Sequence, residues 1–442
     1  MPLSRRSFLV GSSLSVAAGA LTPLLSGAES TKTASPARYD DWASVRREFD
    51  LSPDYIHLGL FYLTSHPRPV REAIEKYRRQ LDSNPFVTVE SSLFESADKN
   101  LPLQICRTIA EYIGGDANDI ALTQNTTTGL ALIYQGLPLR EGDEVLTTTQ
   151  DHYVHHESIR MATSRCGATW RKIPLFDSYA SISADQMVDR IRKGIGPKTK
   201  VLGVTWVHSA SGLRLPIRRI ADVVAQANAG RDEKDRVLLV VDGVHGIGVE
   251  DPKITAMGCD YFSAGTHKWI FGPRGTGFVW AKPAMWAKLR PIIPTFYGLE
   301  LFEAWGSEKE PTQPARAAWF SPGGFQAFEH HWALPAAFQF HRDIGAARIT
   351  ARIHELNHQM KEGLAAMPHI QLYTPRDESL SAGMACFDVK GMKQTEVVSR
   401  LLEKKIVAST TPYRISYARL ACAIVNTPEE VDKTLSEVRR LA

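Results

Sequence analysis

Short apolar runs alternate with helical periodicity through the middle of the chain. The runs at 120–123, 144–146, 201–204 and 237–241, with another around Tyr261 and Phe262, predict buried strands. Residues 105–113 and a segment opening at 127–132 carry the spacing of helices. Alternation of this kind predicts an α/β fold, in which helices cover both faces of a mostly parallel sheet.

The flanking regions follow other patterns. Residues 55–58 predict an extended start, and Pro67 opens an amphipathic helix that runs to about Leu81. Beyond about residue 320, a long helix over 329–343 precedes an alternating strand over 384–389 and a helix over 396–404. We therefore predict an N-terminal arm and helix over 29–90, a large domain over 91–300 and a small C-terminal α+β domain over 320–442.

The first 28 residues have the layout of an export signal. Arg5 and Arg6 precede a stretch of apolar and small residues that ends at Ser26-Gly27-Ala28. The paired arginines predict a twin-arginine signal, so we expect the twin-arginine translocase to carry the folded protein to the bacterial periplasm. This stretch is too short, and too rich in Gly, Ser and Ala, to predict stable membrane insertion.

Charge and cysteine content exclude several other classes. The formal net charge of +4 is small for 442 residues, so no nucleic-acid partner is implied. The five cysteines form no close pair and have no metal-ligand spacing, so we predict neither a disulfide framework nor a metal site.

Two chemically informative residues fall at the ends of neighbouring predicted strands. Asp242 ends the run at 237–241, and Lys268 follows the run around Tyr261. Ligands of parallel sheets bind at the carboxyl ends of strands. A lysine there can hold pyridoxal phosphate (PLP) as a Schiff base, while a carboxylate keeps the pyridine nitrogen protonated. Alone, the pair fits an ordinary strand pair with a surface lysine equally well.

The stretch 241–278 resembles the cofactor site of class V aminotransferase-fold enzymes, which include isopenicillin-N epimerase-like proteins and cysteine desulfurases. The resemblance covers nearly the whole chain after the signal. It implies a PLP-dependent transferase fold of type I, like that of aspartate aminotransferase, and a homodimer. Residues 66–70 and His267-Lys268-Trp269 lean towards the isopenicillin-N epimerase-like members. Exported members of that kind include enzymes that tailor the siderophore pyoverdine.

The resemblance also assigns roles around the cofactor. It implies that Lys268 forms the Schiff base and that Asp242 bonds the pyridinium nitrogen. The other cofactor contacts that it implies are Thr126 and Thr127 at the phosphate, Thr266 and His267 as further phosphate donors, His152 stacked on the ring, and His245 at the phenolic oxygen.

Substrate contacts are implied nearer the C-terminus. The segments 412–416 and 425–430 resemble the closing motif of the family, in which an arginine binds the substrate carboxylate, and this points to Arg414. Arg419 competes for that role. His208 is a candidate substrate contact, although a structural histidine fits equally well. Phe325 stands where many relatives carry a threonine that reaches the phosphate of a neighbouring subunit.

These residues predict a PLP-dependent enzyme that acts on the α-amino group or Cα bonds of a free or peptide-borne amino acid. Transamination or siderophore tailoring is the first expectation, and epimerisation and C–S lysis are alternatives. Cysteine desulfuration is disfavoured because the loop at 408–411 has no cysteine and Cys386 falls inside a predicted strand. A catalytically silent binding protein is the alternative from a different class.

Overall fold

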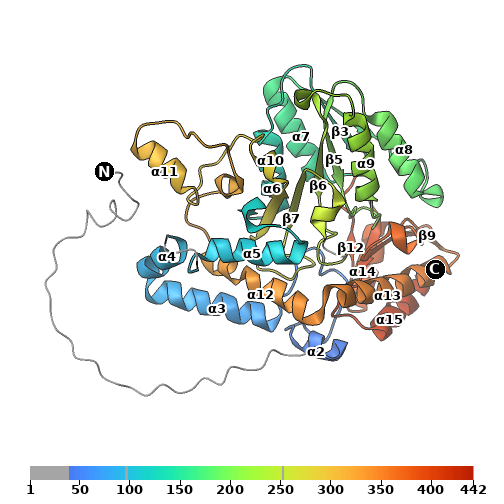
Figure 1. Ribbon diagram of the computed structural model, residues 1–442. Helices are drawn as coiled ribbons and strands as arrows, with labels where there is room; N and C mark the ends of the chain where they lie inside the picture. The colour runs from blue at the N-terminus through green and yellow to red at the C-terminus, as the bar shows by residue number, and fades with distance from the viewer. Residues whose placement is uncertain (1–38, 95–97, 251–252, 442) are drawn as a thin grey trace, which may run out of the picture.

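The computed structural model describes residues 39–94, 98–250 and 253–441. A seven-stranded sheet forms the centre of the larger part of the molecule (Figure 1). Only β8 runs against its neighbours, and the other adjacent strands are parallel. In spatial order the strands are β2 (Ile120–Thr123), β8 (Gly277–Ala281), β7 (Tyr261–Gly265), β6 (Leu238–Asp242), β5 (Thr199–Thr205), β3 (Glu144–Thr148) and β4 (Thr169–Ile173).

Helices cover both faces of this sheet, because alternate strand residues point to opposite sides. Val201 of β5 packs in the core beneath α6 and α7, and its neighbour Leu202 packs in the core beneath α8 and α9. The predicted α/β architecture with a mostly parallel sheet is confirmed. The covering helices are α5 (Leu101–Ile113), α6 (Thr126–Gly136), α7 (Tyr153–Cys166), α8 (Ala184–Gly194) and α9 (Ile217–Asn228).

A smaller four-stranded antiparallel sheet lies in the C-terminal part. Its core is formed by side chains such as Phe387 of β10 and Leu420 of β13, which pack with Met360 of α13. The long helix α12 (Phe328–Ile344) leads into it and ends at Gly345, which has φ +98°. The elements here are α13 (Ala346–Ala365), β9 (Ile370–Leu372), β10 (Met384–Val389), α14 (Gln394–Glu403), β12 (Ser409–Thr410), β13 (Ala418–Ala421) and α15 (Pro428–Arg439).

The N-terminal segment joins the two parts. β1 (Ile56–His57) pairs in parallel with β11 (Ile406–Val407) of the C-terminal part, and α3 (Arg68–Ser83) lies along α12 (Figure 1). Between these elements, Phe61 is 2% exposed and faces the site described below. The shorter helices are α2 (Trp42–Arg47), α4 (Pro85–Leu93), α10 (Pro283–Trp286) and α11 (Leu299–Gly306).

The predicted elements are present, with ends that differ by a few residues. The long helix predicted over 329–343 is α12, and the strand predicted over 384–389 is β10. The proposed signal at 1–28 lies outside the described residues, and the division at 90, 300 and 320 stays a prediction. Among the residues described, no helix has an apolar stretch of the length that crossing a bilayer requires.

Candidate active site

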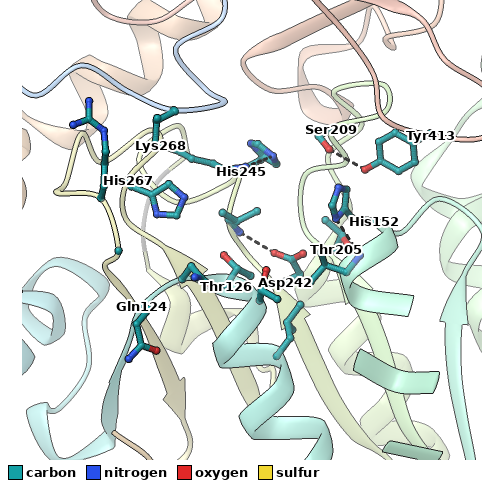
Figure 2. Close-up of a pocket in the computed structure, with 18 residues that line it drawn as sticks. Gln124, Thr126, His152, Thr205, Ser209, Asp242, His245, His267, Lys268 and Tyr413 are labelled. Carbon is teal, nitrogen blue, oxygen red and sulfur yellow. Dashed lines mark hydrogen bonds between the residues drawn. The ribbon is translucent and has the colours of Figure 1, made fainter. Parts of the chain in front are cut away.

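A pocket of about 410 Å³ opens where the parallel strands of the large sheet end. Thr205 ends β5, Asp242 ends β6, and Lys268 follows β7 by three residues, so the direction of the strands brings them to one edge. Figure 2 shows Thr126, Asp242, His245 and Lys268 around one space. Tyr413 enters the lining from the C-terminal part.

The start of α6 forms one end of the pocket. Asn125 caps the helix by accepting a hydrogen bond from the N–H of Thr128 at 2.9 Å, and Thr126 and Thr127 line the pocket. The hydroxyl of Thr126 accepts the N–H of Gly265 at 2.7 Å, which leaves its own proton for a ligand. A helix N-terminus with hydroxyl donors is a binding site for phosphate, and Arg274 also lines the pocket.

Asp242 is held at the bottom of the pocket and is 4% exposed. Its Oδ1 accepts a hydrogen bond from the N–H of Val244 at 3.1 Å. Burial raises the pKa of Asp242 to about 6, and the Val244 N–H and Lys268 oppose that increase. A carboxylate in this environment gains stability from a cationic partner, as a protonated pyridine nitrogen would be.

Lys268 contacts His245, which also receives a hydrogen bond from the residue after the lysine. Nζ of Lys268 lies 3.2 Å from Nε2 of His245, and the indole N–H of Trp269 donates to Nδ1 of His245 at 3.2 Å. Burial lowers the pKa of Lys268 to about 8, while Asp242 opposes and Arg419 adds to the decrease. The amine is therefore closer to its uncharged, nucleophilic form than an exposed lysine would be.

Two further histidines line the pocket. His152 caps α7 by accepting the N–H of Val154 at 3.2 Å, and its ring meets the ring of Tyr413 edge-on at 5.6 Å. Burial, with Lys268 and Arg419 nearby, lowers the pKa of His152 to about 4. His267 lies with Nδ1 3.4 Å from the carbonyl oxygen of Thr276. An uncharged imidazole at His152 suits stacking on an aromatic ring.

Arg419 lies behind the wall of the pocket on β13 and is 3% exposed. Its Nη1 donates to the carbonyl oxygen of Ser209 at 2.7 Å, and its guanidinium lies 4.2 Å from the centre of the Phe61 ring. Ser209 itself lines the pocket, where its hydroxyl and the hydroxyl of Tyr413 are 2.8 Å apart. Arg419 lowers the pKa values of Lys268, His152 and His245, so its charge acts on the pocket.

Thr266, to which the sequence analysis gave a cofactor contact, and His208 and Arg414, to which it gave substrate contacts, do not line the pocket that the described residues form. Thr266 is buried, and its hydroxyl oxygen lies 2.6 Å from the hydroxyl oxygen of Thr276. His208 is wholly buried, with Nε2 3.4 Å from Asp151, as expected of a structural histidine. Arg414 is exposed in the loop before β13, because the strand that reaches the site begins only at Ala418.

Sequence reasoning assigned no role to Ser209 or Tyr413, and it did not place Trp269 against His245. These three residues have no sequence pattern that indicates their place in the site. Arg419, by contrast, could be recognised as a candidate because it is a charged residue inside an otherwise apolar stretch at 417–425. A charge within such a strand indicates burial with a partner or a ligand.

The donor set fits the groups of PLP. The start of α6 and Arg274 suit its phosphate, Asp242 suits a protonated ring nitrogen, and the buried amine of Lys268 suits its aldehyde. The fold and the site together define a PLP-dependent enzyme of fold type I.

The comparisons with known proteins agree. Residues 63–433 match the family described as aminotransferase class-V, and the chain belongs to that family. The chain is 26% identical over 409 residues to isopenicillin N epimerase of Streptomyces clavuligerus, covering 89% of this chain and 96% of that protein. It is 24% identical to a probable cysteine desulfurase of Halalkalibacterium halodurans, covering 85% and 90%.

Solved structures show the same fold. A cystine C–S lyase in complex with its product cysteine persulfide has a TM-score of 0.73 at 23% identity, covering 88% of this chain and 98% of the other. An apo cysteine desulfurase from Thermococcus onnurineus has a TM-score of 0.75 at 18% identity, covering 90% and 97%.

Proposed function

We propose that this enzyme transfers protons at Cα of an amino acid, free or peptide-borne, in a transamination-type reaction. One observation carries the proposal: the buried amine of Lys268 shares a pocket with Asp242, and the guanidinium of Arg419 lies behind the adjoining wall. Lys268 is thus placed to hold the cofactor and to move a proton, and Arg419 to hold a carboxylate.

Each residue has a distinct part in this scheme. Bound PLP supplies an electron sink for the bonds at Cα. Asp242, as a carboxylate, holds the ring nitrogen in its protonated form. Lys268, when uncharged, would take the proton from Cα, and in transamination it would deliver that proton to the cofactor instead of returning it to Cα. Three of the five N–H groups of Arg419 donate to protein oxygens in the described structure, and the other two remain for a carboxylate.

The cysteines do not support a desulfurase mechanism. All five are described, and none lines the pocket. Burial raises the pKa values of four thiols to about 12, and those cysteines are Cys106, Cys259, Cys386 and Cys422. The fifth, Cys166, donates to the carbonyl oxygen of Ala162 within α7. C–S lysis remains an alternative, because elimination requires proton removal at Cα but no protein thiol.

Epimerisation is a second candidate. It requires a proton donor on the face of the substrate opposite to Lys268, and the hydroxyl of Tyr413 lies in the pocket wall. Burial raises the pKa of Tyr413, so this hydroxyl stays protonated and able to donate. The similarity to isopenicillin N epimerases from two organisms adds to this candidate.

Titration of the purified protein with amino acids and small peptides, followed by absorbance, tests these alternatives. Conversion of the cofactor to pyridoxamine phosphate by one donor would support transamination. Incorporation of deuterium from D2O at Cα, with inversion and without loss of the amine, would support epimerisation. Failure to bind PLP, or PLP bound without response to any substrate, would support a catalytically silent binding protein.

We propose the periplasm as the site of action, on the basis of the segment 5–28. A peptide-borne amino acid of a siderophore such as pyoverdine is then a substrate to include in the titration. N-terminal sequencing of the protein recovered from a periplasmic fraction checks the export step. A start near Glu29 supports it, and retention of Met1 contradicts it.

We also propose that two copies of the chain associate. Several large apolar side chains between residues 292 and 325 are exposed, including Trp305 at 69% and Phe325 at 80%. The Phe325 end of this segment adjoins the pocket, because the next residue, Gln326, contacts Gln124 of the pocket wall at 3.5 Å. Light scattering should show a dimer that Phe325→Glu weakens, and a monomeric wild type would contradict the proposal.

A further inference from the structure

Lys268 and Trp269 are consecutive residues that both contact the imidazole of His245. The indole N–H of Trp269 donates to Nδ1, and Nζ of Lys268 lies 3.2 Å from Nε2. An indole N–H can only donate, so Nδ1 of His245 must accept. In an uncharged imidazole the proton then sits on Nε2 and faces the lysine.

This tautomer discriminates between the two charge states of the lysine. An ammonium group has only donors, so its N–H groups and the Nε2–H of His245 would face each other without forming a hydrogen bond. An uncharged amine has a lone pair and accepts a hydrogen bond from Nε2–H. We propose that Trp269 is a positioning residue, which holds the proton of His245 on Nε2 and thereby favours the uncharged, nucleophilic amine of Lys268. The inference rests on the proposed function, in which Lys268 captures PLP.

The indole is held in place. Trp269 is 2% exposed, and its ring lies 6.3 Å from that of Phe61, which in turn lies 5.9 Å from His245. On another side, Gly383 has φ +65°, and a Cβ there would come within 2.9 Å of the indole. With close neighbours on both sides, the ring has little room to turn its N–H away from Nδ1.

The other charged and titratable groups that act on Lys268 do not depend on Trp269. The tautomer of His245 is therefore the feature through which the indole changes the charge state of the lysine. Asp242 favours the ammonium form and Arg419 disfavours it. Burial lowers the pKa values of His152, His245 and His267, so these rings are uncharged near neutral pH. Without the indole donor, the proton of His245 could move to Nδ1, and the Nε2 lone pair would then stabilise the ammonium form of Lys268.

The rate at which the apo-protein captures PLP measures this effect without turnover. Capture is stopped with borohydride, the modified Lys268 peptide is quantified by mass spectrometry, and the rate is plotted against pH. Trp269→Phe should raise the midpoint by about one pH unit, which slows capture at neutral pH roughly tenfold. The plateau rate at high pH should stay the same.

Trp206→Phe is the matched control. This substitution removes another buried indole, that of Trp206, which packs against Gly246. It leaves the hydrogen bond from Trp269 to His245 in place. Its midpoint should equal that of the wild type. In a His245→Ala background, Trp269→Phe should cause no further shift, because the residue through which the indole acts is gone.

The outcomes separate the inference from the function. A wild-type apo-protein that captures no PLP overturns the proposed function and this inference together. Capture with an unchanged midpoint in Trp269→Phe, or a lowered plateau with no shift, overturns the inference alone. If that variant folds poorly, the ¹⁵N shifts of the His245 ring in the wild-type apo-protein decide, since a proton on Nδ1 contradicts the proposal.

Discussion

The two walls of the pocket are built differently. The wall from the large sheet carries Asp242 and Lys268 at neighbouring strand ends, beside the start of α6 with Thr126. The wall from the C-terminal part is formed by Tyr413, which lies in the loop before β13. Arg419 lies behind this wall, on the short strand β13 itself. Arg414 and Ile415 of that loop are exposed, and Ile415 is 67% so.

This difference separates two tasks. Side chains at the ends of hydrogen-bonded parallel strands keep fixed spacings, as the groups that hold a cofactor must. A loop beside a smaller sheet can change in length and sequence while the sheet edge stays intact. We infer that the large sheet fixes the chemistry and that the C-terminal wall selects the substrate.

Removing Lys268 should have the largest effect. Lys268→Ala should abolish turnover, because no other amine is placed among the described pocket residues to hold the cofactor. The loss should exceed roughly 1,000-fold in kcat. Steady-state kinetics with PLP in excess would measure it. Multiple turnover by the variant at a wild-type rate would show that the large-sheet wall does not carry the chemistry.

Arg419 and Arg414 test the substrate wall as a pair. Arg419→Ala should lower kcat/KM for carboxylate substrates by roughly 100-fold, because it removes a buried partner for the carboxylate. Arg414→Ala should change it less than about twofold, since that side chain is exposed. Kinetics on an amino acid and on its amide measure both effects. A larger loss in kcat/KM for Arg414→Ala than for Arg419→Ala would instead identify Arg414 as the residue that binds the carboxylate.

Asp242 should make PLP binding depend on pH. Its carboxylate form would hold the pyridinium of PLP, and burial raises the pKa of Asp242 to about 6. Affinity should therefore fall as the pH drops through about 6 and the carboxylate gains a proton. Asp242→Asn should weaken binding roughly tenfold near neutral pH and remove that dependence. Equilibrium titration of apo-protein with PLP measures both effects, and an unchanged pH profile in the variant would contradict the assignment.

Tyr413→Phe should have a smaller effect than the loss of Lys268, Arg419 or Asp242. The change removes the hydrogen bond to Ser209 at 2.8 Å, worth about 1 kcal/mol, and keeps the ring against His152. We expect a severalfold loss in kcat/KM for transamination. Measurement of racemisation with the same variant sharpens the comparison, because near-complete loss of that activity alone would make the tyrosine the second proton donor.

The sequence predicted the large-sheet wall better than the other wall. Buried parallel strands are continuous apolar runs, so their ends, and with them Asp242 and Lys268, could be located by eye. β8 and β4 were missed: β8 follows a glycine-rich turn, and β4 is an edge strand with exposed Thr169, Arg171 and Lys172. β4 has neither the alternation nor the apolar run that identifies a strand, whereas the apolar run of β8 is only four residues long and directly follows the turn.

On the C-terminal wall, a resemblance in motif order favoured Arg414, but only the fold shows which arginine is buried. The spacing from 412 to 430 does not reveal where the loop ends and β13 begins. The contacts of Trp269 and Lys268 with His245 could not be predicted from the sequence either. It depends on which way two rings face, and that orientation comes from packing against Phe61 and Gly383.

The pairing of β1 with β11 has a consequence for how the enzyme is made. Tyr55 and Lys405 are 350 residues apart in the chain and adjacent in the fold. Phe61, which follows β1, lies against His245 and Arg419. A ribosome must therefore add more than 350 residues after Phe61 before this aromatic ring can pack against the guanidinium of Arg419. The pocket therefore cannot assemble during synthesis until both β1 and the strand that carries Arg419 have left the ribosome.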